Sequence, residues 1–168
     1  MEMVSLPRVL QHMARLPAFA RMLDAMWSKR ACTQADPYHL VIYGDEFAVG
    51  DLLRQDNRRK SLGLYVTFRE FGPDVIKLSD AWIPLAVCRS TVARDIVEGG
   101  HASVVRTLLR RLFLEDRIAS DGIVVPMERS SGGSAVLYFK LGNLVLDGDA
   151  QRIVFSGLGA SAKLPCLS

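Results

Sequence analysis

The sequence predicts a mixed α/β domain. Three apolar segments of strand length, 39–45, 61–68 and 82–88, follow one another along the chain. An amphipathic helix is predicted next, at 101–114, and an extended apolar segment follows it at 136–146. Parallel strands need a long crossover connection, and this helix provides one between the last strand and the first. The order of elements therefore favours a mixed sheet with a crossover helix.

Composition narrows the class of protein. The chain has 168 residues, which suits one domain, and its hydrophobic fraction of 49% is sufficient for a core. A net charge of +3 is too mildly basic to indicate nucleic-acid binding by itself. The cysteines are widely spaced, no apolar run reaches the length of a membrane span, and no secretory signal begins the chain. We therefore expect an intracellular protein with no membrane partner.

An N-terminal helical segment is predicted at 1–30. Its apolar residues recur at helical spacing: Leu6, Val9, Leu10, Met13 and Leu16, then Phe19, Met22, Leu23, Met26 and Trp27. Pro17 suits the first turn of a second helix. Two interpretations are open, a helical hairpin that covers a core and a pair of helices that binds a protein partner.

The later segments carry their own signals. Apolar residues alternate with a period of two in 61–68, and Pro84 places 82–88 at a sheet edge or a bulge. The segment 136–146 is either a long strand or the partner of 123–125 in a hairpin. The helix at 101–114 has an apolar face and a basic face, and the basic residues are Arg106, Arg110 and Arg111.

Carboxylates follow two of the predicted strands. Asp45 ends the first strand, and Asp147 and Asp149 follow the last. If the two strands are neighbours, Asp45 and Asp149, or Asp147, are placed to share Mg²⁺ or Mn²⁺, which prefer oxygen ligands. The alternative is that these acids are turn residues, for which Asp147-Gly148 is a typical signal.

Nucleases that hold metal ions between the ends of two such strands need a third carboxylate further along the chain. No Asp or Glu follows Asp149, and Glu46, Asp51 and Glu70 are weak substitutes by position. We therefore expect the chain to be inactive, or a piece of something longer, rather than a complete nuclease.

Basic residues gather in two places. A polar segment after the first strand contains Arg54, Arg58, Arg59 and Lys60. Together with Arg106 and Arg110 on the helix, these are candidates for contacts with DNA phosphates. No aromatic residues interleave the segment, so base stacking is not indicated. The alternative is a solvated face with local salt bridges.

Histidines and cysteines do not indicate a zinc site. His39 is predicted to lie in a strand and His101 near a helix start, and neither has a cysteine or carboxylate at ligand spacing. Cys88, inside an apolar strand, is predicted to be an inert buried thiol.

A series of short motifs resembles a block in transposon-encoded proteins of eukaryotes. In that block an apolar strand ends in Tyr-x-Asp-Asp/Glu, a loop of small residues follows, and a lysine leads into a Leu-Gly-x-x-Tyr strand. The matching residues here, in the same order, are 43–50, Lys60, 62–65, 121–123, 148–150, 157–159 and Cys166. With Asn57-Arg58-Arg59-Lys60 and Glu70-Phe71-Gly72, the chain is also similar to an expanded, uncharacterised family of unicellular algae.

The resemblance implies a DDE-type transposase with a ribonuclease H-like core over 38–168, incomplete at its C-terminus. It makes Asp45 the first metal-binding acid and Asp149 the second, with Mg or Mn as cofactor, DNA as partner and the nucleus as location. The third acid and the Cys/His clusters of such proteins are absent from the sequence, so a truncated or degenerate core is expected. The competing hypothesis is a cytoplasmic protein-interaction module that uses its N-terminal helices and has no metal site.

Overall fold

A four-stranded mixed sheet organises the molecule. The computed structural model describes residues 3–48, 60–95, 98, 100–127 and 133–146. The sheet contains β1 (Tyr38–Ala48), β2 (Lys60–Phe68), β3 (Ile83–Arg89) and β6 (Phe139–Leu146), in the order β3-β2-β1-β6. β2 is antiparallel to both β1 and β3, whereas β6 is parallel to β1. The predicted mixed α/β plan, with its last strand parallel to its first, is confirmed.

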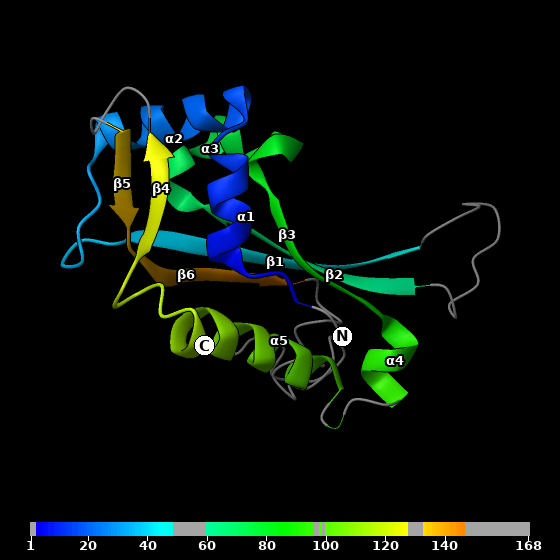
Figure 1. Ribbon diagram of the computed structural model, residues 1–168. Coiled ribbons are helices and arrows are strands. Elements are labelled where there is room, and N and C mark those ends of the chain that lie inside the picture. The colour runs from blue at the N-terminus through cyan, green and yellow to red at the C-terminus, as the bar shows by residue number, and fades with distance from the viewer. Residues whose placement is uncertain (1–2, 49–59, 96–97, 99, 128–132, 147–168) are drawn as a thin grey trace, which may run out of the picture.

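Helices and a small hairpin accompany this sheet. The helices are α1 (Leu6–Met13), α2 (Pro17–Lys29), α3 (Pro73–Ile76), α4 (Ser90–Asp95) and α5 (Gly100–Arg110). β4 (Ile123–Met127) and β5 (Gly133–Leu137) form a separate antiparallel pair. In Figure 1, α1 crosses in front of the sheet, α2 and the β4–β5 pair lie above it, and α5 runs below. No helix in the described part of the chain is long and apolar enough to span a membrane.

The N-terminal helices pack on the sheet through their apolar stripes. Proline stands in the first turn of each helix, where a missing N–H is tolerated. Leu6 and Leu10 of α1 and Phe19 and Leu23 of α2 are buried in the same hydrophobic cluster as the strands. The helical hairpin that covers a core is thus the observed arrangement.

The sheet has two unlike faces. We call the core face the one that carries Leu40, Ile42 and Gly44 of β1, all of which are buried. An aromatic series joins α2 to this face: Phe19 lies 5.8 Å from Phe71, Phe71 5.1 Å from Phe68, and Phe68 5.0 Å from Phe139, measured between ring centroids. We call the opposite side, which carries Tyr43 and Asp45, the outer face, because alternate strand residues point to opposite sides.

A bulge adjusts the pairing of β6 with β1. Leu40 pairs with Leu141 but Val41 pairs with Asn143, so Gly142 is the extra residue. The segment 136–146 is therefore not one strand: β5 ends at Leu137 and β6 begins at Phe139. The described register of the parallel pair ends with Gly44 opposite Leu146.

Candidate metal-binding strand end

Asp45 lies on the outer face of β1 and is partly buried. The hydroxyl of Tyr43 donates a hydrogen bond of 2.9 Å to its Oδ2 atom. Its partner across the β1–β2 ladder is Gly63, which has no side chain to cover the carboxylate. One carboxylate oxygen thus accepts from a neutral phenol, and no described cation pairs with Asp45.

Aromatic rings surround this position. The Tyr43 ring centroid lies 6.4 Å from that of Tyr65 and 5.7 Å from that of Trp82. A Cβ atom placed on Gly63 would lie 2.7 Å from the Tyr65 ring and 2.9 Å from the Phe47 ring, so both rings lie over the glycine. Asp45 is therefore a carboxylate beside an aromatic surface.

Most of the predicted partners of Asp45 lie outside the described residues. This holds for Asp147 and Asp149, for Asp51, and for Arg54, Arg58 and Arg59. Within the described residues, no group of three or more His, Cys, Asp or Glu residues is placed to hold a metal ion. The metal site that the sequence predicts therefore remains a prediction.

The two described candidates for a third carboxylate do not join Asp45. Glu46 follows Asp45 in the strand and so points to the core face, where its Oε1 lies 3.8 Å from Nε2 of His101. Its Oε2 lies 4.0 Å from Nζ of Lys60. Glu70 is instead hydrogen-bonded to Arg30 and His39.

The described basic residues are only in part available to a ligand. Lys60, at the start of β2, has an exposed side-chain fraction of 43% and faces Glu46. Arg106 is exposed on α5. Arg110 lies 3.8 Å from Glu115, and Arg111 lies 3.1 Å from the same carboxylate. Arg110, the last residue of α5, and Arg111, directly after it, are therefore engaged in local salt bridges.

A partly buried ionic cluster, which was not predicted from the sequence, joins the end of α2 to β1. Nη2 of Arg30 donates to Oε1 of Glu70 at 3.0 Å, and Nδ1 of His39 lies 2.7 Å from the same oxygen. The backbone N–H of His39 donates to Oε2 of Glu70 at 3.0 Å. Burial lowers the pKa of Arg30, but a hydrogen bond from the guanidinium to Asp36 and the charges of Asp36 and Glu70 outweigh it, so the pKa is raised. No local spacing signals this cluster, because Glu70 is 31 residues from His39.

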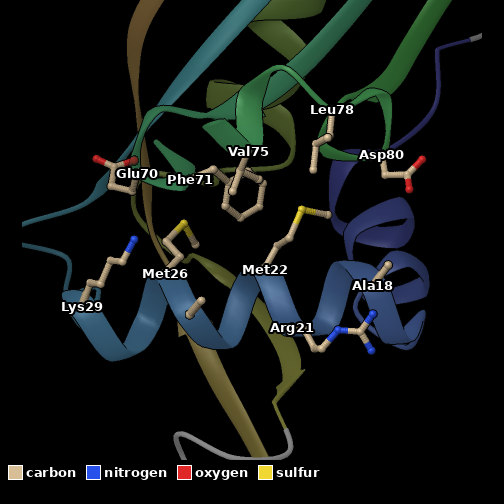
Figure 2. Close-up of a pocket in the computed structure, with 11 residues that line it drawn as sticks. Ala18, Arg21, Met22, Met26, Lys29, Glu70, Phe71, Val75, Leu78 and Asp80 are labelled. Atoms are coloured by element: carbon tan, nitrogen blue, oxygen red, sulfur yellow. The ribbon is translucent and has the colours of Figure 1, made fainter. Parts of the chain in front are cut away.

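A groove of about 310 Å³ lies beside that cluster, between α2 and residues 70–80 (Figure 2). Its apolar lining includes Met22, Met26 and Phe71. Figure 2 shows Lys29 and Glu70 at one end, with Arg21 and Asp80 toward the other. The groove is thus an apolar surface with charges at both ends, built by elements other than the strand end that carries Asp45.

Comparison of the chain with protein-family models, with curated proteins and with solved structures finds no match.

Proposed function

We propose that this chain is a degenerate transposase- or integrase-like core that binds a divalent metal ion and nucleic acid weakly, without turnover. The observation that carries the proposal is the parallel pairing of β1 with β6, whose described register ends at Gly44 and Leu146. In the sequence, Asp45 follows Gly44, and Asp147 and Asp149 lie just after Leu146. The sheet order β3-β2-β1-β6, with the last strand parallel to the first, also supports the proposal, although α4, α5 and the β4–β5 pair all come between β3 and β6.

The available donors suit weak binding of a hard cation. Mg²⁺ and Mn²⁺ take carboxylate oxygens and retain several waters, so two aspartates suffice to hold one ion loosely. Two-metal phosphoryl chemistry needs more carboxylate ligands than this. Glu46 points to the face of the sheet opposite Asp45, and Glu70 is hydrogen-bonded to His39, which supports binding without catalysis.

Mn²⁺ is the ion to test first. We expect Mn²⁺ to raise the melting temperature by a few degrees, because an ion that binds only the folded state stabilises it. The double variant Asp45→Asn with Asp149→Asn should lose that rise. Thermal denaturation at increasing Mn²⁺ concentration measures both.

The matched control is Asp74→Asn, which removes an acid whose side chain is 92% exposed and pairs only with Lys77 among the described residues. This variant should keep the response of the unmodified protein. If the double aspartate variant responds to Mn²⁺ as strongly as Asp74→Asn, the proposed site is wrong.

The alternative of a protein-interaction module gains no specific support. The apolar residues with which α1 and α2 would bind a partner, Leu6, Leu10, Phe19 and Leu23, are buried in the hydrophobic core.

A further inference from the structure

A buried imidazole nitrogen lies at the start of α5. The side chain of His101 is 8% exposed, and its Nε2 atom is buried with no hydrogen-bond partner in the described structure. A buried polar atom without a partner is costly, and such atoms are usually satisfied by water, an ion or a ligand. Nε2 of His101 is therefore a candidate to bind water, an ion or a ligand.

The carboxylate of Glu46, on the core face of β1, lies beside this nitrogen. Its Oε1 lies 3.8 Å from His101 Nε2, which is longer than a hydrogen bond. Zinc binds histidine nitrogen and carboxylate oxygen at about 2.0–2.2 Å each, so two ligands of one ion lie at most about 4 Å apart. The observed separation fits two atoms that share one ion.

We propose that Glu46 and His101 bind a divalent transition-metal ion of the Zn²⁺ type, with water completing its coordination. Imidazole nitrogen together with carboxylate suits Zn²⁺ better than Mg²⁺, which takes oxygen ligands. This site is independent of the proposed site at Asp45, because Asp45 and Glu46 point to opposite faces of the sheet.

Lys60 competes with the ion for Glu46. Its Nζ lies 4.0 Å from Glu46 Oε2, and its side chain is 43% exposed, so it is free to turn toward solvent when the ion binds. An ammonium near a cation opposes binding through charge repulsion. Removing the charge in Lys60→Gln should therefore tighten Zn²⁺ binding several-fold.

The direct test is a Zn²⁺ titration of the full chain, followed by isothermal calorimetry and by the ¹⁵N signals of its histidines. The nitrogen of His101 should shift, whereas those of exposed His12 and of His39, already bonded to Glu70, should not. Glu46→Gln should lower the Zn²⁺ affinity at least tenfold. This isosteric change removes the negative charge and leaves the shape of the side chain.

Two matched variants separate this site from other sources of binding. Glu115→Gln removes an exposed acid that pairs with Arg111, and Cys88→Ser removes a buried thiol. Both should keep the Zn²⁺ affinity of the unmodified protein. The proposal is overturned if the His101 signal does not move, if Glu46→Gln binds as tightly as Glu115→Gln, if Lys60→Gln binds no more tightly, or if Cys88→Ser abolishes binding. The Mn²⁺ proposal is tested by the double variant at Asp45 and Asp149, whereas this one is tested by Glu46→Gln and by the His101 signal, so either proposal can fail alone.

Discussion

At the scale of single residues, Cys32 ties the end of the helical hairpin to the sheet. Its buried thiol lies 3.2 Å from both the N–H and the carbonyl oxygen of Tyr138, accepting from one and donating to the other. The same carbonyl accepts a hydrogen bond from the backbone N–H of Tyr38, which opens β1. Burial raises the pKa of the Cys32 thiol, although its hydrogen bonds to the backbone lower it.

This raised pKa makes stability depend on alkaline pH. The folded protein keeps the thiol proton at a pH where the unfolded chain, with a cysteine pKa of about 8.5, loses it. The free energy of unfolding should therefore be unaffected by Cys32 below pH 8 and fall as the pH rises above about 8.5. Urea denaturation between pH 7 and pH 9.5 measures this slope.

Serine at position 32 keeps a hydroxyl donor but does not ionise in this range. The Cys32→Ser variant should thus show a flatter pH dependence, whatever its absolute stability. Burial raises the pKa of Tyr38 as well, but a tyrosine in the unfolded chain has a pKa of about 10 and stays mostly protonated in this window, and Tyr38 is present in both proteins. An identical slope in both proteins would show that Cys32 is not the titrating group.

Contacts between residues that are far apart in the chain were not predicted from the sequence. The sequence placed His39 in a strand and His101 near a helix start, and both positions are correct. It offered no carboxylate for either, because ligand spacing was sought locally. Folding brings Glu70 to His39 across the first two strands and Glu46 to His101 across the crossover connection.

At the scale of elements, the periodicity of apolar residues predicted the type of the longer elements, but not the breaks and short helices between them. The two N-terminal helices, the three antiparallel strands and the helix at 101–114 were predicted with their types correct. The break at Tyr138 between β5 and β6 was missed, because apolar residues stand on both sides of it and no Gly or Pro marks it. α4 was missed too, since it spans only Ser90–Asp95 and has too few turns for a helical pattern.

Gly142 is the residue on which the β1–β6 pairing depends. An ideal Cβ at this position would lie 2.8 Å from His39 Cβ and 3.0 Å from the carbonyl oxygen of Leu40, so neighbouring backbone would have to move. Gly142→Ala should therefore lower the free energy of unfolding by about 1–3 kcal/mol, the usual range for overpacking. Chemical denaturation measures it.

The neighbouring exposed residue provides the control for that experiment. Asn143→Ala changes the next position of β6 without a steric conflict and should stay within about 0.5 kcal/mol of the unmodified protein. Equal stabilities for Gly142→Ala and Asn143→Ala would mean that the bulge tolerates a side chain.

At the scale of the whole molecule, the sequence suggested two parts, a helical segment at 1–30 and a core at 38–168. Buried residues of α1 and α2 belong to the same hydrophobic cluster as those of the sheet. The segment before α1 also contacts the sheet, since the Val4 N–H donates a hydrogen bond to the carbonyl oxygen of Leu85 in the edge strand β3. Composition and spacing do not reveal such sharing, because an apolar stripe looks the same whether it covers a neighbouring sheet or a separate partner.

A shared core predicts one cooperative unfolding transition. Leu10, on α1, is fully buried, so Leu10→Ala should lower the free energy of unfolding by about 2–5 kcal/mol, whereas Leu16→Ala, with 46% of Leu16 exposed, should lower it much less.

The two tryptophans report on the two parts: Trp27 lies in α2, and Trp82 directly precedes β3. With Trp82→Phe, fluorescence follows the helices alone, and with Trp27→Phe it follows the sheet. Both signals should have coincident midpoints, and Leu10→Ala should lower both equally, because a single unit unfolds all at once. A helical signal that melts first, with the Trp82 midpoint unmoved by Leu10→Ala, would instead make 1–30 a separable segment and restore the partner-binding interpretation of its helices.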